Sequence, residues 1–258
     1  MRKLNKLNKP RRMLMAILLG SCVLTAANKT TTEALDTYEK QYGALMNNVV
    51  NVNTPGYRAV KIITRQDKNG SLVTEETASF FKNGQMVFSG DPLHAAIDGP
   101  GFFSVRAPQG DMFTRDGRFI VNSEGELVTL SGRYPVLAAG GNTIQLDVND
   151  SLDLQISETG LIIQNGEMRD RLAVGELDTS ITLRTVNGAF FEAPDSEAAF
   201  INLEAPRIRQ YYFEGSNVEM SEELVAMPDI SKKYDANAKV LQIMKKITTT
   251  GREMGSAQ

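Results

Sequence analysis

The chain has very few of the residues on which catalytic and metal sites are usually built. Its 258 residues include no tryptophan, one histidine and one cysteine. Because a disulfide needs two cysteines and a Cys/His metal site needs several ligands, neither can form within one chain. A Ser-His-Asp triad could use only His94, for which a surface or interface position is the simpler interpretation. The glycines occur singly or at turns, without a phosphate-binding loop, so we expect no enzyme, no metal and no cofactor.

The first 27 residues differ in composition from the rest of the chain. Six basic residues within the first twelve positions precede residues 13–27, which are almost all apolar or small. This layout is typical of a secretory signal peptide, and an apolar stretch of about 15 residues is short for a transmembrane span. Three routes are compatible with it: cleavage after Ala27, lipidation of Cys22 in a loose lipobox, or an uncleaved or misassigned start.

Loss of this segment would make the chain strongly acidic. It would remove six basic and no acidic residues, changing the formal net charge from −3 to −9. An acidic chain is a poor partner for nucleic acid, which is itself negatively charged. We therefore expect no nucleic-acid partner, and membrane association only through the N-terminal signal or a lipid anchor.

An amphipathic segment then leads into an asparagine-rich stretch. Apolar side chains in residues 34–50 recur at spacings of three and four, which predicts one apolar stripe on a helix. At Pro55-Gly56 proline fixes φ and glycine permits positive φ, so a sharp turn should follow the helix. Four asparagines in seven residues are more than one turn needs, since each amide can cap backbone groups. The stripe comprises Leu35, Tyr38, Tyr42, Leu45 and Val49, and the asparagines are Asn47, Asn48, Asn51 and Asn53.

The middle of the chain has the pattern of an antiparallel β domain. From residue 80 to 148, short apolar runs alternate with turn signals at intervals of about 8 to 12 residues. Residues 61–77 are mostly polar and predict a connecting loop or a loose hairpin. Gly117 and Gly125 are expected to close hairpins, and Asn165-Gly166 is a favoured hairpin turn pair. The expected core comprises Phe102, Phe103, Val105, Phe113, Phe119, Val121 and Leu127, and Leu152, Leu154 and Ile156 alternate along a further strand.

The C-terminal segment has the clearest helical pattern. Side chains at alternating spacings of three and four form a heptad seam, and a second apolar stripe lies beside it. Two stripes need more cover than a shorter N-terminal helix with one stripe provides, although an ordinary helical hairpin with residues 34–50 is the alternative. The seam consists of Met227, Ile230, Tyr234, Asn237, Leu241, Met244 and Thr248, and the second stripe of Val240, Ile243 and Ile247.

Two local signals bear on where this helix begins. Ser216 and Glu219 have the spacing of a capping box, which would start a helix there. Pro228 lacks a backbone N–H and would interrupt it. We therefore expect the continuous helix to begin only at Met227 or Pro228.

Together these patterns predict an α+β fold with N- and C-terminal helices and a central antiparallel β domain. The expected domains are a signal-like segment at 1–27, the N-terminal helix and asparagine-rich turn at 28–60, the β-rich domain at 61–207, and the C-terminal helix at 208–258. Terminal helices with surplus apolar surface indicate a subunit that completes its core by assembly. A head-to-tail contact that does not close on itself gives a helical filament.

Three stretches of the chain resemble motifs of one family, the bacterial flagellar rod and hook proteins. Residues 47–57 (NNVVNVNTPGY) resemble its N-terminal asparagine-rich motif. Residues 93–105 (LHAAIDGPGFFSV), followed by 113–119 (FTRDGRF), resemble its mid-chain block. Residues 215–219 (GSNVE), followed by 234–240 (YDANAKV), resemble its closing motif.

The resemblance implies a structural subunit of the flagellar basal-body rod, the axial drive shaft for motility. Its terminal helices would pack as a coiled-coil-like rod core, with the β domain outside. It implies self and other rod or hook subunits as partners, a periplasmic basal-body location, and no small-molecule substrate. The expected assembly interface comprises Leu35, Tyr38, Tyr42, Leu45, Asn47, Asn48, Asn51, Asn53, Met227, Ile230, Tyr234, Asn237, Leu241 and Met244.

Some questions stay open at this level. The length is similar to that of basal-body rod proteins, proximal or distal, and the short linker between Tyr57 and Phe80 leans away from the distal form. Residues 1 to about 23 precede the usual family start, so export by the general secretory route and by the flagellar type III apparatus both remain. The alternatives are a rod-protein paralogue, exported by the general route as a periplasmic or lipid-anchored accessory, and a periplasmic enzyme or carbohydrate-binding β domain.

Overall fold

The chain divides into two compact units. The computed structural model describes the backbone of residues 9–66, 68, 72–78, 82–147, 153–177, 183–193 and 200–256, and the side chains of most of these from residue 27 onward. One unit, the helical unit, comprises Met1–Asn47, Lys61–Thr77 and Ser221–Gln258. The other, the β unit, comprises Asn48–Val60 and Ala78–Met220. The chain therefore passes between the two units four times.

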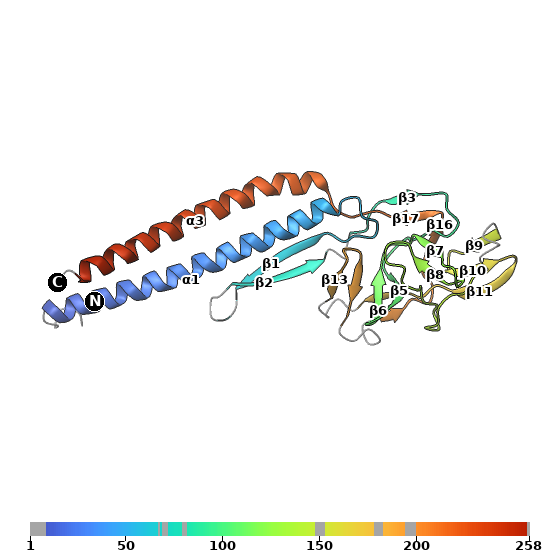
Figure 1. Ribbon diagram of the computed structural model, residues 1–258, viewed down its shortest axis with the longest axis horizontal. Helices are drawn as coiled ribbons and strands as arrows, with labels where there is room; N and C mark the ends of the chain where they lie inside the picture. Colours follow the sequence, from blue (N-terminus) through green and yellow to red (C-terminus); the bar gives the residue numbers. More distant parts are fainter. Residues whose placement is uncertain are drawn as a thin grey trace. The chain divides into compact units, whose positions relative to one another are not determined.

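Two long helices and a two-stranded sheet form the helical unit. The helices are α1 (Lys9–Val50) and α3 (Met220–Ser256), and the sheet pairs β1 (Val60–Gln66) with β2 (Leu72–Ala78). The helices run side by side (Figure 1), and the Tyr234 hydroxyl of α3 donates a hydrogen bond of 3.1 Å to the Glu39 carboxylate of α1. The Thr37 hydroxyl of α1 lies 3.2 Å from that of Thr74 on β2. Of the two possibilities for residues 61–77, the hairpin is confirmed.

The helix α1 is longer than the sequence pattern predicted. With 42 residues it exceeds the 37 of α3, and it continues through the expected cleavage position after Ala27. The expectation of a shorter first helix was therefore wrong. The side chain of Cys22, the candidate lipidation site, lies outside the described residues. Within the described part of the chain, no helix has the length and hydropathy that a membrane span requires.

The start of α3 also differs from the prediction. The helix begins at Met220, so Pro228 lies inside it, where the missing N–H leaves the carbonyl of Leu224 without its helical donor. Both residues are exposed, so water can satisfy that carbonyl and the helix continues. The predicted capping box was wrong as well. The Ser216 hydroxyl accepts a bond of 3.2 Å from the N–H of Val218, ahead of the helix, and Glu219 forms an ion pair with Lys82 instead.

The β unit is built from short strands in several small sheets. A six-stranded sheet has the order β13-β14-β6-β5-β12-β15, a three-stranded sheet the order β11-β10-β9, and three two-stranded sheets pair β16 with β4, β17 with β3, and β7 with β8. Each of these pairings is antiparallel, as predicted. The strands are β3 (Met86–Phe88), β4 (Ala95–Ile97), β5 (Phe102–Ala107), β6 (Gly110–Thr114), β7 (Phe119–Val121), β8 (Leu127–Thr129), β9 (Leu154–Ile156), β10 (Leu161–Gln164), β11 (Glu167–Arg171), β12 (Val174–Leu177), β13 (Arg184–Val186), β14 (Phe190–Glu192), β15 (Phe200–Asn202), β16 (Ile208–Gln210) and β17 (Tyr212–Glu214).

The predicted aromatic core is confirmed and lies on both faces of β5. Successive side chains of a strand point to opposite faces, so Phe102 and Phe103 enter different hydrophobic clusters. Phe102 meets Phe191 edge-on at 5.5 Å between ring centroids, and Phe103 meets Phe119 in the same way at 5.1 Å. Val105, Phe113 and Leu127 are also buried, and Val121 is half-buried. Leu154 and Ile156 are buried on β9 as predicted, whereas Leu152 lies outside the described residues.

Two of the three predicted hairpin turns are confirmed. Asn165 and Gly166 join β10 to β11 with φ of 55° and 76°, the left-handed pair of a type I′ turn, and Gly125 joins β7 to β8 with φ of 84°. The expectation for Gly117 was wrong, because the strands on either side of it belong to different sheets. Its carbonyl accepts a 2.9 Å bond from the N–H of Ala95, and a Cβ at position 117 would overlap the carbonyl oxygen of Ala95. Gly117 therefore serves close packing between backbones.

The structure divides the chain differently from the expected domain ranges. Residues 48–60 and 208–220 belong to the β unit, whereas 61–77 belong to the helical unit. Tyr57, Ala59 and Val218 form a small buried cluster inside the β unit. Local helix and strand patterns do not contain this information, because the contacts join residues from opposite ends of the chain.

Candidate functional site

The sharp turn predicted after the first helix is confirmed. The N–H of Tyr57 donates a 3.2 Å bond to the carbonyl of Thr54, and Gly56 has φ of 72° at the third position of the turn. Proline second and a positive φ third define a type II turn. Gly56 also lies so close to the backbone of Arg115 and Asp116 that an added Cβ would collide with them. The turn thus brings the asparagine-rich motif against the mid-chain motif.

Asn48 closes the loop that contains this turn. Its side chain is 2% exposed. The amide oxygen accepts a 2.8 Å bond from the N–H of Val60, and the amide nitrogen donates a 2.9 Å bond to the carbonyl of Val60. The Tyr57 hydroxyl donates a further bond of 3.1 Å to the same amide oxygen. A single buried side chain therefore joins the end of α1 to the start of β1.

Asn217 plays the equivalent role on the C-terminal side. Its amide oxygen accepts a 2.6 Å bond from the N–H of Ala59, and its amide nitrogen donates a 2.8 Å bond to the carbonyl of Lys82. Its own backbone N–H donates to the carbonyl of Tyr57 at 3.3 Å. The closing motif is thus fixed to the asparagine-rich motif by both backbone and side chain.

A buried carboxylate with two arginines lies beside these asparagines. Glu214 is 2% exposed, and its oxygens lie 3.0 Å from the Arg58 guanidinium and 2.5 Å from that of Arg115. The N–H of Gly84 also donates to Glu214 at 2.7 Å. Arg115 donates its remaining protons to the carbonyls of Ile97, Gly99 and Gly101.

Burial dominates the electrostatics of this cluster. Desolvation lowers the pKa of Arg58 to about 10, against the opposing effect of Glu214. Desolvation also lowers the pKa of Arg115, again opposed by Glu214. An arginine side chain keeps its charge in proteins, so the cluster is one carboxylate between two cations. We call Asn48, Arg58, Arg115, Glu214 and Asn217 the junction.

The junction was only partly visible in the sequence. Asn48 was predicted as an interface residue, and the structure places it inside its own chain. Arg58, Arg115 and Glu214 were missed, although each lies within or next to one of the three motif stretches. Arg58 and Glu214 each stand as a charged residue next to glycine and aromatic neighbours. Arg115, in contrast, is followed by Asp116 and Arg118 and carries no such local signal. Of the other asparagines, Asn47 and Asn53 are exposed, and Asn51 accepts a 3.0 Å bond from the Thr54 hydroxyl.

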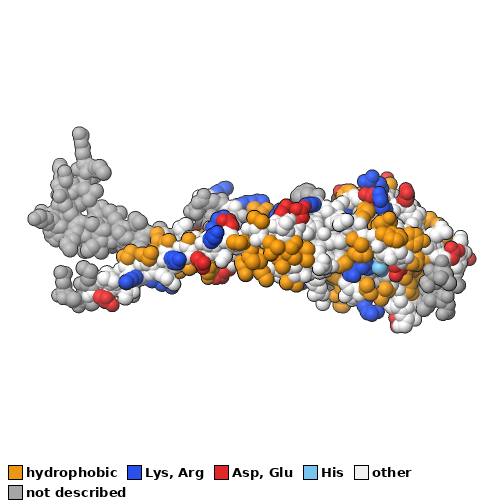
Figure 2. Space-filling model, turned by 90° about the horizontal axis from the view of Figure 1, so that it is seen from above, with side chains coloured by type: hydrophobic (Ala, Val, Ile, Leu, Met, Phe, Trp, Pro, Cys, Tyr) orange, Lys and Arg blue, Asp and Glu red, His pale blue; other side chains and the backbone are white. Residues whose placement is uncertain are grey.

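The predicted stripes of α3 differ in exposure. Six of the seven seam residues are half-buried and Thr248 is exposed, whereas the second stripe is open to solvent. On α1, Leu45 is buried, Leu35 and Tyr38 are half-buried, and Tyr42 is exposed. Hydrophobic side chains gather along the helices on the face drawn in Figure 2. The exposed apolar side chains of α3 are Leu224, Val225, Val240, Ile243 and Ile247.

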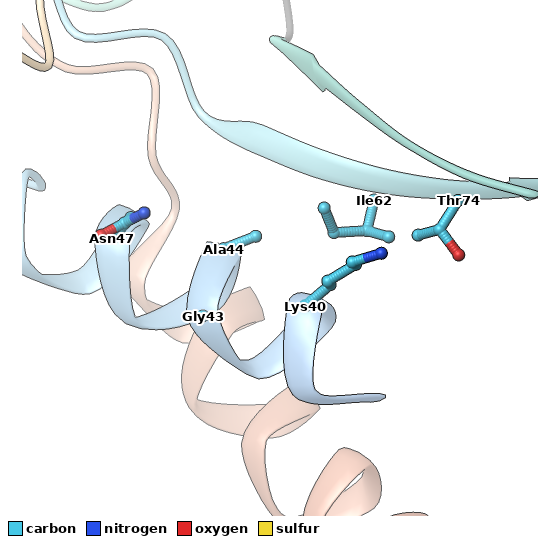
Figure 3. Close-up of a pocket in the computed structure, with 6 residues that line it drawn as sticks. All are labelled: Lys40, Gly43, Ala44, Asn47, Ile62 and Thr74. Carbon is cyan, nitrogen blue, oxygen red and sulfur yellow. The ribbon is translucent and has the colours of Figure 1, made fainter. Parts of the chain in front are cut away.

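A groove lies between α1 and the sheet of the helical unit (Figure 3). It has a volume of about 370 Å³, and Gly43 on its α1 wall has no atom within 4 Å of the position of a Cβ. Its walls are Lys40, Gly43, Ala44 and Asn47 of α1, Ile62 of β1 and Thr74 of β2.

Gly43→Ala should stabilise the helical unit. A glycine inside a helix costs about 1 kcal/mol relative to alanine, and the open space at Gly43 accepts a methyl group. We expect a higher midpoint of thermal unfolding by far-ultraviolet circular dichroism. The reverse change at the neighbouring buried position, Ala44→Gly, is the matched control and should lower it. A lower midpoint for Gly43→Ala would contradict the prediction.

The lone histidine lies between Ser89 and Asp91. His94 is half-buried, and its ring packs edge-on against Phe213. Burial lowers its pKa. Its Nδ1 lies 2.9 Å from the Ser89 hydroxyl, and that hydroxyl also lies 3.0 Å from the carbonyl of Tyr211, to which it can donate. In the described part of the chain, no group of three or more His, Cys, Asp or Glu residues is placed to hold a metal ion.

Comparison with known proteins agrees with the motifs. Residues 96–164 match the family described as the flagellar hook protein FlgE/F/G D1 domain, and residues 209–253 match the C-terminal region of the flagellar basal body rod FlgEFG proteins. Arg115 falls within the first match, and Glu214 and Asn217 fall within the second.

Similarity to whole proteins extends over most of the chain. The flagellar basal-body rod protein FlgF of Rhizobium meliloti (strain 1021) is 33% identical over 205 residues, which cover 76% of this chain and 84% of that protein. FlgF of Caulobacter vibrioides is 29% identical, over 80% of this chain and 87% of that protein. The rod protein FlgG of Agrobacterium fabrum is 26% identical, over 86% and 94%. The chain therefore belongs to the flagellar basal-body rod protein family.

Proposed function

We propose that this chain is a structural subunit of the flagellar basal-body rod and that it assembles through its two long helices. The names of its relatives support the rod assignment. The observation that supports assembly through the helices is the solvent-exposed second stripe of α3, Val240, Ile243 and Ile247. It lies beside the seam, six of whose seven residues are already half-buried in the single chain. This assignment is preferred over a secreted accessory paralogue.

The second stripe of α3 exposes more apolar surface to water than a helix of a soluble protein usually does. A helix of a soluble protein usually carries one apolar face, and α3 carries two. Contiguous apolar surface on a folded chain marks a site of association. The helical hairpin within one chain covers the seam only in part, and it leaves Val240, Ile243 and Ile247 without cover. Association with further helices would remove this surface from water.

The partners that fit this surface are other copies of the chain and other rod or hook subunits. An apolar stripe along a helix fits the apolar stripe of another helix, and a head-to-tail contact repeated by rotation generates a filament. We accordingly place the assembled subunit in the periplasmic part of the basal body. The β unit has its own core, so it can remain folded during assembly.

Ile243→Asp combined with Ile247→Asp should block assembly without unfolding the free subunit. Both side chains are exposed in the single chain, so the free protein loses little. In an assembled rod each carboxylate would be buried without a partner, which would weaken the free energy of assembly by roughly several kcal/mol. We expect normal circular dichroism, absence of the variant from purified basal bodies, and non-motile cells, whereas the wild-type chain copurifies with basal bodies.

The matched control is Gln242→Asp combined with Thr249→Asp. It adds the same two charges to exposed positions of the same helix, away from both stripes. This variant should assemble and support swimming. If the stripe variant is recovered from basal bodies as efficiently as the control, the stripe is not the assembly surface.

A further inference from the structure

Three of the four passages of the chain between the units lie within three residues of a junction residue on the β-unit side. The chain enters the β unit at Asn48, leaves it after Val60, returns at Ala78 and leaves again after Met220. Asn48 bonds to Val60, so the first entry and the first exit are joined directly. These two passages therefore form one closed loop of the β unit.

The other two passages are joined to the same loop. Asn217, three residues before the last exit, bonds to the N–H of Ala59 and to the carbonyl of Lys82. Arg58 donates a second bond of 2.6 Å to that carbonyl of Lys82, which follows the second entry. Glu214 ties Arg58 to Arg115 of the mid-chain motif. Buried polar groups thus join three of the passages directly and bond Lys82, four residues after the remaining one.

Hydrophobic contact alone does not hold residues 48–60 in place. The buried apolar side chains there are Tyr57, Ala59 and Val60. Tyr57 and Ala59 form only a small cluster with Val218, apart from the other two clusters of the β unit, and Val60 belongs to none of the three. The buried amides and charges have no water to replace their partners, so each broken bond leaves an unsatisfied group. The polar network therefore contributes most of the attachment of this segment.

The helical unit has little core of its own. Within its described residues, the buried hydrophobic side chains are Ala44 and Leu45. Regions with few buried apolar contacts open at lower free energy than the core of a protein. The helices should therefore open before the β unit does.

We infer that the junction acts as a lock that keeps the β unit closed, with residues 48–60 and 208–220 in place, while the helical unit opens. This inference goes beyond rod assembly and does not depend on it. In the free subunit, the β unit would then stay folded even when the helices are open. A test of the lock needs only the purified chain.

Limited digestion of the full-length wild-type chain with trypsin tests the lock. Exposed basic residues of the helical unit, Lys40, Lys61 and Lys232 among them, should be cut first. Lys82 should be cut slowly, because two junction side chains bond to its scissile carbonyl. Cutting at these sites leaves a peptide of residues 41–61 that is no longer covalently linked to the body. If the junction locks it, the peptide coelutes with the body in gel filtration.

Two variants and a control complete the experiment. Asn48→Ala and Asn217→Ala each remove two buried bonds, so the peptide should leave the body at least about tenfold faster. Asn53→Ala changes an exposed asparagine in the same peptide and should behave as the wild type. Asn217→Asp, which keeps the acceptor for the N–H of Ala59 and loses the donor to Lys82, should give intermediate release.

The wild-type result alone can overturn the inference. Loss of the 41–61 peptide from the wild-type body at the first gel filtration would show that no lock exists. Equal retention by the wild type and by the folded Asn48→Ala and Asn217→Asp variants would show that the junction does not provide it. Either result leaves the rod assignment unaffected.

Discussion

Glu214→Ala is expected to lower the free energy of unfolding of the β unit by about 3–5 kcal/mol, the usual cost of removing one partner from a buried ion pair. Glu214 is the carboxylate that faces both Arg58 and Arg115. Its loss leaves two buried guanidinium groups close together, and burial already disfavours their charged forms. Urea denaturation followed by circular dichroism measures the loss.

The control for this prediction is a surface pair. Glu192 pairs with Arg184 at 2.7 Å, but the arginine side chain is 77% exposed. Exposed ion pairs contribute about 0–1 kcal/mol, so Glu192→Ala should change stability little. Glu214→Gln, which keeps an acceptor for the N–H of Gly84 but loses the charge, should fall between the two. A loss no greater than that of the control would mean that the two arginines are satisfied by carbonyls alone.

Gly117→Ala is expected to disrupt the β unit by more than about 3 kcal/mol, beyond ordinary overpacking. The new Cβ would overlap the backbone carbonyl of Ala95, which no rotation of a side chain can relieve. Relief requires β4 to move, and β4 is fully buried and pairs with β16. We expect low soluble yield and early unfolding by thermal circular dichroism.

Gly140→Ala is the matched control for this glycine. The nearest atom to a Cβ at position 140 is the side-chain nitrogen of Asn142, at 3.9 Å, which is ordinary van der Waals contact. A surface substitution of this kind changes stability within about 0.5 kcal/mol. If Gly117→Ala is as stable as Gly140→Ala, the backbones at Ala95 and Gly117 are not as closely packed as described.

Features that depend on neighbours in sequence were predictable. Asn165-Gly166 selects its turn through the φ angles of two adjacent residues, and Pro55-Gly56 does the same. The seam of α3 follows from spacing alone, and six of its seven residues are half-buried. Its role in assembly stays a prediction. Gly117 has the sequence signal of a hairpin turn, as these pairs do. In the structure, however, a glycine is required there because the backbone of Ala95 on β4 lies too close for a Cβ.

The junction could not be predicted because its partners are distant along the chain. Arg115 and Glu214 are 99 residues apart, and Ala59 and Asn217 are 158 apart. No periodicity or spacing rule connects such residues. Pro228 was wrongly predicted to interrupt the helix for a local reason. Its effect depends on whether water can bond to the carbonyl of Leu224, which a sequence pattern does not reveal. Sequence patterns predicted the helices and most of the strands. Which buried charged residues pair with one another could be seen only in the folded structure.

The strand order of the β unit has a kinetic consequence. Its first two strands pair with its last two, since Phe88 faces Tyr212 and Ile97 faces Ile208. These ladders close a loop that contains almost the whole unit, and the entropy of loop closure must be overcome before they form. A chain with such a high contact order folds slowly and only when its C-terminal part is present. The β unit therefore cannot complete these two sheets until residues 208–214 are available to pair.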